Sequence, residues 1–234
     1  MGAANYKNNT AIKPTTKSGK ANGDYYFNNK GELVQVLYSN YTHLNQRSLY
    51  ATSTISYENG CGPVSALMAA NMQGRLKQYV GDYYNKNRYT ASAAFRNFMN
   101  TFIKVSGDKK IGRADGEGVY STEIEKVLNK HSVTAVHKNE LNPYNSSLRE
   151  YLTYGKVSIV SFEYFQGHFM VVNGWRINSG QLQYNIVDPW GVNTSPSAKG
   201  DSDGWHTATH LKNISEKKNG VIVFVNVGDF IKIL

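Results

Sequence analysis

The chain has 234 residues, of which 40% are hydrophobic and 12% aromatic, and its 26 basic and 17 acidic side chains give a formal net charge of +9. This composition excludes a disordered chain, and no apolar run is long enough to span a bilayer. The lysines are spread through loops without a basic helix, so we expect no nucleic-acid partner. A diffuse positive charge suits an anionic surface such as a cell wall.

The first 22 residues are rich in Asn, Lys, Thr and Gly, which predicts a flexible N-terminal arm at 1–22 followed by a single domain at 23–234. The start of the chain lacks the apolar core of a signal peptide. It is compatible with a cytoplasmic protein or with an exported bacterial protein whose leader has been removed. We favour the extracellular or cell-surface location, and we expect a monomer.

A hairpin is predicted at 25–36, where aromatic and apolar residues flank a turn that contains Gly31. A helix is expected to follow Cys61 and run to about Gln73, with Pro63 at its first position and Gly74 ending it. Further helices are predicted near 75–84, along the apolar stripe 95–102, at the capping box 122–125 and at the similar box 147–150.

The second half changes to the period of strands. Runs of β-branched and aromatic residues predict strands at 156–164, 168–177, 181–187 and 220–227, and strands joined by short turns pair antiparallel. Helices followed by strands predict an α+β domain, in which an N-terminal helical part packs on a C-terminal antiparallel sheet. The chain has no dinucleotide, P-loop or zinc-protease motif, so no cofactor is expected.

Cys61 is the only cysteine, which rules out an internal disulfide but leaves the compartment open. It stands between Gly60 and Gly62 at the expected start of a helix. A helix N-terminus favours the thiolate, which is the attacking form, and the glycines leave room for substrate backbone beside the sulfur. The alternative is a buried structural cysteine, and the flanking glycines with Pro63 argue against it.

His168 follows Gly167 and opens a hydrophobic strand, and Asp188 ends the strand that should return beside it. With the hairpin turn near Ser179, the two side chains fall close to the same level. A carboxylate there can fix the imidazole tautomer and stabilise the imidazolium. Cys61, His168 and Asp188 are therefore the candidate catalytic residues. A satisfied surface or core histidine and an ordinary strand-ending turn are the structural alternatives.

Three segments resemble motifs of the C39-like cysteine peptidases of the papain superfamily. Asn59–Ser65 is similar to their Gly-Cys-Gly-Pro-Thr-Ser box, Gly167–Trp175 to their Gly-His-apolar-Gly-Tyr segment, and Val187–Gly191 to their Asn-Asp-Pro-Trp-Gly segment. The resemblance covers residues 57–191. It implies a papain-like fold and a thiol protease in which Cys61 is the nucleophile, His168 the general base and then acid, and Asp188 the orienting group.

One feature departs from the papain pattern. Papain-like enzymes carry a glutamine shortly before the cysteine as an oxyanion donor, whereas Ile55 stands there in this chain. Gln46 and Asn59 are the candidate replacements, in addition to the backbone N–H of Cys61, and losing one such donor costs roughly 10²–10³ in rate. The candidates for lining the cleft are Gly60, Gly62, Gly167, Trp190 and Trp205.

Other polar residues are assigned no role. His206 and His210 have the i, i+4 spacing of helical metal ligands, but a third ligand is not evident and the Thr-rich sequence favours a loop, so no metal is expected. Asp201 and Asp203 lie between glycines with incomplete calcium-loop spacing. His43 is expected at the surface.

Four functions stay open. Hydrolysis of an amide bond in a peptide through an acyl-enzyme is preferred. A peptidoglycan amidase or endopeptidase acting on stem peptides would use the same triad, and the positive charge favours it mildly. Transfer of the acyl group to an amine is the third. The fourth is a non-catalytic cell-surface binding module of the same fold, which the missing glutamine would suit. Rapid alkylation of Cys61 would favour the catalytic functions.

Overall fold

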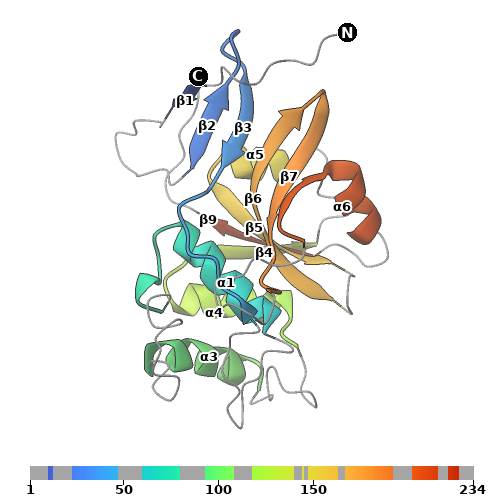
Figure 1. Cartoon of the computed structure of the whole chain (residues 1–234). Helices are drawn as coiled ribbons and strands as arrows, with labels where there is room; N and C mark the ends of the chain where they lie inside the picture. The colour runs from blue at the N-terminus through green and yellow to red at the C-terminus, as the bar shows by residue number, and fades with distance from the viewer. Residues whose placement is uncertain are drawn as a thin grey trace.

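The computed structural model describes residues 10–12, 23–46, 60–79, 93–107, 118–139, 144, 147–162, 167–191, 202–215 and 221–226. Helices α1, α3 and α4 gather at one end of the molecule, and the strands extend away from them (Figure 1). In chain order the elements are β1 (Thr10–Ile12), β2 (Asp24–Phe27), β3 (Leu33–Leu37), α1 (Cys61–Met72), α3 (Ala93–Val105), α4 (Ser121–Lys130), β4 (Ala135–Asn139), α5 (Ser147–Thr153), β5 (Lys156–Phe162), β6 (His168–Asn178), β7 (Gln181–Val187), β8 (Gly204–Thr207), α6 (Ala208–Ser215) and β9 (Val221–Asn226).

The described strands form one antiparallel sheet in the order β1-β2-β3-β6-β5-β9-β4, and β7 joins β6 to β8. Strand β6 has three partners. Residues 168–172 pair with β5, residues 174–176 pair with β3, and the stretch from 171 to 178 pairs with β7. Gly174 permits the close approach of β3, because a Cβ there would lie 2.7 Å from the carbonyl oxygen of Val36.

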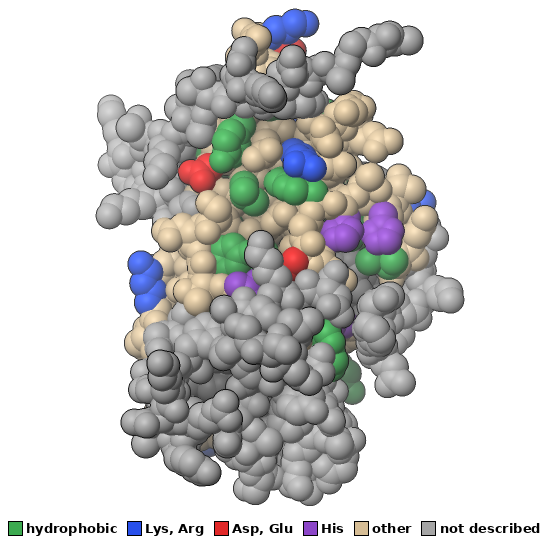
Figure 2. All heavy atoms as spheres, viewed as in Figure 1, with side chains coloured by type: hydrophobic (Ala, Val, Ile, Leu, Met, Phe, Trp, Pro, Cys, Tyr) green, Lys and Arg blue, Asp and Glu red, His purple; other side chains and the backbone are tan. Residues whose placement is uncertain are grey.

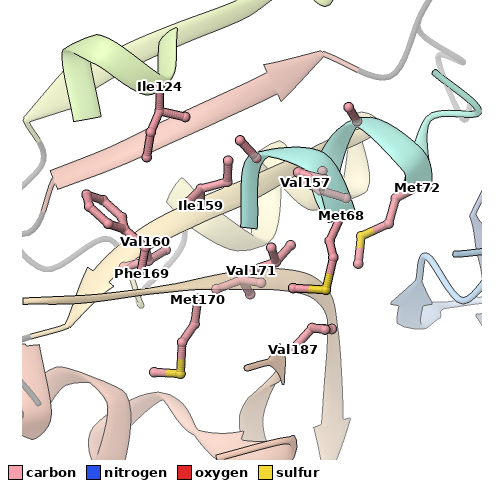
Figure 3. Close-up of a cluster of buried hydrophobic side chains, with 14 of the residues drawn as sticks. Met68, Met72, Ile124, Val157, Ile159, Val160, Phe169, Met170, Val171 and Val187 are labelled. Carbon is pink, nitrogen blue, oxygen red and sulfur yellow. The ribbon is translucent and has the colours of Figure 1, made fainter. Parts of the chain in front are cut away.

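Helix α1 is enclosed by the rest of the domain. Every residue from Gly62 to Met72 is buried, as expected for a helix that is apolar on all sides. The helix lies against β5, β6 and α4. Figure 3 shows Met68 of α1 in one apolar cluster with Ile159 of β5 and Val171 of β6. This packing fixes the helix over the centre of the sheet.

The structure confirms the predicted α+β architecture, with the cysteine-bearing helix packed on an antiparallel sheet. The hairpin, α1, α3, α5 and the four later strands lie within a few residues of their expected positions. The sheet is larger than expected. The N-terminal hairpin joins it through β3, and β4, which lies between α4 and α5 in the chain, adds a strand next to β9. In the predicted arm, residues 10–12 form β1, in which Thr10 pairs with Phe27 of β2, and the other residues of 1–22 lie outside the described part.

Three local predictions were wrong. Helix α1 begins at Cys61, so Pro63 is its third residue; this is tolerated because N–H groups of the first turn have no acceptor within the helix. Helix α4 is capped earlier than Thr122, since the main-chain N–H of Tyr120 donates to Glu123 at 2.7 Å. The loop expected at 204–210 forms β8 and the start of α6, because pairing with β7 outweighs weak local propensity.

Of the helix predicted near 75–84, residues 80–84 lie outside the described part, and within the described half residues 77–79 are helical. Within the described part of the chain, none of the helices has the length and apolar character needed to span a membrane.

Candidate active site

Cys61 is the first residue of α1, and the residue is partly exposed. Gly60 is the N-cap, and its carbonyl oxygen accepts the N–H of Val64 at 3.0 Å. One turn into the helix, the hydroxyl of Ser65 donates to the carbonyl oxygen of Phe169 at 3.0 Å, in a buried bond. Phe169 is the second residue of β6, so this bond fixes the start of α1 against the start of β6.

Gly62 is buried next to the sulfur-bearing residue, and its lack of a side chain is required. A Cβ at this position would overlap the Cγ2 of Val119 and would come within 3.4 Å of Ile124 and Phe169. Val119 is itself 7% exposed. The segment before α4 therefore packs directly on the first turn of α1, where a larger residue could not be accommodated without displacement.

His168 and Asp188 meet at the shared end of β6 and β7. His168 is the first residue of β6, Asp188 follows the last residue of β7, and their exposed fractions are 8% and 2%. Val171 lies opposite Val187, which brings Asp188 level with the beginning of β6. The Nε2 atom of His168 lies 2.6 Å from Oδ1 of Asp188. The hairpin thus places a buried carboxylate on one nitrogen of the imidazole.

The Asp188 carboxylate is held by the main chain as well. Its Oδ1 accepts the N–H of Trp190 at 2.8 Å, and its Oδ2 accepts the N–H of Ser202 at 3.1 Å. Hydrogen bonds to an ionised carboxylate are stronger than neutral ones. Together with the bond to His168, they fix the direction in which the carboxylate points.

The imidazole of His168 also hydrogen-bonds the sulfur of Cys61. Because Nε2 is directed at Asp188, Nδ1 is the nitrogen available to the sulfur. Burial by itself lowers the pKa of His168, but the bonds to Asp188 and Cys61 and their charges outweigh it and raise the pKa to about 10. Burial raises the pKa of the Cys61 thiol, and the His168 bond and charge reverse that effect and lower it. The pair favours thiolate and imidazolium.

Trp190 provides an apolar neighbour for this pair. Its ring meets the imidazole of His168 edge-on, with the ring centroids 6.4 Å apart and an interplanar angle of 87°. Trp190 follows the Asp188 turn and donates its main-chain N–H to Asp188. The residue is therefore tied to the carboxylate through its backbone and to the imidazole through its ring.

Gln46 lies beside the same turn. It is fully buried, and its main-chain N–H donates to the carbonyl oxygen of Pro189 at 2.7 Å. The side chain of the preceding residue, Asn45, accepts the N–H of Gly191 at 3.2 Å. The segment upstream of α1 therefore folds back against residues 189–191. The other oxyanion candidate, Asn59, lies outside the described residues.

The glycine candidates and Trp205 have different surroundings. Gly60 and Gly62 flank Cys61, and Gly167 precedes His168 with φ of 103°, a value that favours glycine. Trp205 is not brought to the imidazole. Its ring lies 4.4 Å from the guanidinium of Arg176, in the half of β6 that is remote from His168.

Sequence reasoning missed a second carboxylate–histidine pair next to Asp188. Oδ1 of Asp203 accepts the main-chain N–H of Asp188 at 2.6 Å, and Oδ2 of Asp203 lies 3.1 Å from Nε2 of His43. The expectation of a surface position for His43 was wrong, because its side chain is only 12% exposed. The Gly- and Asp-rich sequence around Asp203 was the available signal, and its calcium-like spacing pointed elsewhere.

His206 and His210 lie together without forming a metal site. Their rings stack with centroids 5.3 Å apart, and Nε2 of His206 hydrogen-bonds the carbonyl oxygen of Ser202. Histidine side chains reach the surface on the side of α6 (Figure 2). Among the residues that the structure describes, no group of three or more His, Cys, Asp or Glu side chains could hold a metal ion.

Comparison with solved structures gives likenesses of low identity. The avirulence protein AvrPphB of Pseudomonas is 13% identical, with a TM-score of 0.34, over 76% of this chain and 96% of its own. A structure from work on antibody cross-reactivity between the mite allergens Blo t 1 and Der p 1 is 11% identical, with a TM-score of 0.39, over 80% and 67%. Digestive procathepsin L2 from the larval midgut of Tenebrio molitor is 16% identical, with a TM-score of 0.38, over 79% and 64%.

These structural likenesses are too weak to assign a family, and no curated protein matches the sequence. The sequence model of the Peptidase_C39 like family, however, matches residues 38–212. That match spans most of the chain and includes Cys61, His168 and Asp188. The chain therefore belongs to the Peptidase_C39 like family and is a cysteine peptidase.

Proposed function

We propose that this peptidase cleaves amide bonds through a Cys61–His168–Asp188 triad and an acyl-enzyme. The observation that carries the proposal is the chain of hydrogen bonds from sulfur to imidazole to carboxylate, with 2.6 Å between His168 Nε2 and Asp188 Oδ1. A nucleophile, a base and a group that orients the base are the parts that covalent acyl transfer needs. The lowered pKa of Cys61 and the raised pKa of His168 support the same assignment.

In the first half-reaction, the Cys61 thiolate attacks the carbonyl carbon of the scissile amide, and a C–S bond forms as the carbonyl oxygen becomes an oxyanion. The imidazolium of His168 then gives its Nδ1 proton to the leaving amine as the C–N bond breaks. In the second half, His168 removes a proton from water, the hydroxide attacks the thioester, and the thiolate leaves. Asp188 retains its bond to Nε2 throughout and stabilises the imidazolium.

The oxyanion is stabilised by the backbone N–H of Cys61 and by the side-chain amide of Gln46. Gln46 supplies the group that the missing upstream glutamine would have provided. Its complete burial and its bond to Pro189, next to Asp188, support this role. Two donors fixed before the reaction stabilise developing negative charge without reorganisation. Asn59 is the alternative donor.

The substrate is a peptide, as the family indicates. The peptidoglycan stem is the second candidate, because the formal net charge of +9 favours association with an anionic wall. That candidate also carries our proposal of an extracellular or cell-surface location. We further propose that the enzyme acts as a monomer.

A substrate panel tests the proposal. The wild-type protein and the Cys61→Ala variant are incubated with an unstructured peptide library and with purified peptidoglycan, and new amino termini are identified by mass spectrometry. We expect wild-type cleavage of peptides and none by Cys61→Ala. Asp24→Asn, which changes a carboxylate bonded to Ser39 at the remote hairpin, is the matched control.

Other outcomes select other functions. Release of stem peptides alone would favour the wall hydrolase, and incorporation of an added amine at the acyl position would favour transfer. Iodoacetamide measures the sulfur independently of substrate, and alkylation should be faster than that of a free thiol at neutral pH. Slow alkylation that is unchanged in His168→Ala would contradict the triad and leave the binding module.

A further inference from the structure

We propose that Asp203, held in place by His43, is a positioning residue for the Asp188 carboxylate. The inference rests on the proposed triad and deepens it. Asp203 does not contact the sulfur or the imidazole in any described bond. It contacts the main chain of the residue that orients the imidazole, through the 2.6 Å bond from Asp188 N to Asp203 Oδ1.

Residues 188 and 202–203 are joined in both directions. The main-chain N–H of Asp188 donates to the side chain of Asp203, and the main-chain N–H of Ser202 donates to the side chain of Asp188, at 3.1 Å. One bond fixes the backbone that carries the Asp188 carboxylate, and the other fixes the carboxylate itself. Rotation of the Asp188 side chain would break the bond from Ser202, and a shift of the Asp188 backbone would break the bond to Asp203, so the geometry at His168 depends on the segment that carries Asp203.

His43 completes this support from a third segment. Its Nε2 lies 3.1 Å from the second oxygen of Asp203, and both side chains are nearly buried, with 12% and 13% exposed. The residues after His43 are anchored beside the same turn, through the bond from Gln46 N to Pro189 O. The charge of Asp203 also reaches this segment, because burial first and then that charge raise the pKa of Tyr41.

This arrangement matters because the proposed triad tolerates only small displacements of its side chains. Catalytic groups must be held within a fraction of an ångström of the productive geometry, and partners outside the reacting shell supply that precision. Asp188 follows a strand and lies in a turn, where the ladder of β7 no longer fixes the backbone. Asp203 takes over as the acceptor for the Asp188 N–H.

Kinetics with single variants provide the first test, with the active fraction taken from the rapid phase of Cys61 alkylation by iodoacetamide. We expect Asp203→Ala to lower kcat per titrated site about 10- to 100-fold, the range typical for the loss of an outer partner, with KM nearly unchanged. Asp203→Asn keeps an acceptor for Asp188 N and should lose less. His43→Gln keeps a side-chain donor, so its kcat per titrated site should be higher than that of His43→Ala. Asp24→Asn is the control.

A double-mutant cycle separates positioning from general support of the fold. If Asp203 acts through the Asp188 carboxylate, Asp203→Ala should cost little further activity in an Asp188→Asn background. Equal losses in the two backgrounds would overturn the proposal, as would an unchanged kcat per titrated site in Asp203→Ala. Should that variant fail to fold, equal activities of His43→Gln and His43→Ala would overturn it.

Failure of the triad itself gives a different pattern. In that case Cys61→Ala or Asp188→Ala would retain wild-type turnover in the same assay, whatever the Asp203 variants do. Loss of activity in those two variants, combined with wild-type kinetics per titrated site in Asp203→Ala and His43→Ala, would leave the triad standing and remove only the role of Asp203.

Discussion

The main-chain N–H of Gln46 donates a 2.7 Å hydrogen bond to the carbonyl oxygen of Pro189, which joins a residue well before the cysteine-bearing helix α1 to the residue after Asp188. This bond brings the segment before Cys61 to the carboxylate end of the proposed triad. It also fixes the backbone from which the buried Gln46 side chain extends, beside the residues that follow Asp188.

The first prediction concerns the side chain of Gln46. Gln46→Ala should lower kcat by roughly 10²–10³, because one oxyanion donor is lost, while KM changes little. Steady-state kinetics on a peptide substrate measure both constants. Gln35→Ala, on strand β3, serves as the control. A rise in KM with kcat unchanged would mean that Gln46 binds substrate and does not stabilise the oxyanion.

Asp188→Asn is the second prediction. An asparagine preserves the size of the side chain but can present the wrong group to His168 Nε2, so the imidazole loses its tautomer and the stabilisation of its charge. In the Ser-His-Asp proteases the corresponding change costs about 10⁴ in kcat, and we expect a loss of that order here. Stopped assays at high enzyme concentration measure it. Activity within a few fold of wild type would remove Asp188 from the mechanism.

The third prediction is the pH dependence of kcat/KM. As pH rises through the lowered pKa of Cys61, the thiolate forms and activity increases; as pH rises toward 10, His168 loses the proton that the leaving amine needs, and activity decreases. The profile should therefore be a bell with a broad plateau. Cys61→Ser should abolish it, and His168→Ala should move the onset of iodoacetamide alkylation to higher pH.

The fourth prediction concerns packing at Gly62. Gly62→Ala should lower the free energy of unfolding by about 1–3 kcal/mol, because the added methyl group overlaps Val119. Urea denaturation followed by circular dichroism measures the change. Gly118→Ala is a matched control, since nothing lies within 4 Å of a Cβ there.

The same site allows a coupling test. In a Val119→Ala background, Gly62→Ala should cost less than it does alone, because the overlapping Cγ2 atom is gone. Additive effects of the two substitutions would show that Gly62 is required for another reason.

Much of the fold follows from local sequence, and the exceptions have physical causes. Helix α1 and strands β5, β6 and β7 were predictable because their apolar periods are long and their turns carry glycine. Strand β8 could not be predicted, because its short sequence Gly-Trp-His-Thr becomes a strand only through pairing with β7. The start of α1 was misjudged at Pro63, since several positions of a first turn tolerate proline.

The candidate site shows the same division. The approach of Asp188 to His168 could be estimated by counting along one hairpin, because both residues belong to adjacent strands. The pair of His43 and Asp203 could not, because each comes from a different segment and neither lies on a strand next to the other. Gln46 was proposed on the condition that its loop folds back, and the bond to Pro189 depends on that path.

The enclosure of α1 has a consequence for how the enzyme can fail. We expect a helix packed on all sides to open only together with the elements around it, so Cys61 stands at the end of a well-protected element of the described structure. We therefore expect no partially unfolded form in which α1 is detached while the sheet remains folded. A partly denatured preparation should then contain fewer active molecules, and each active molecule should keep the turnover of the native enzyme.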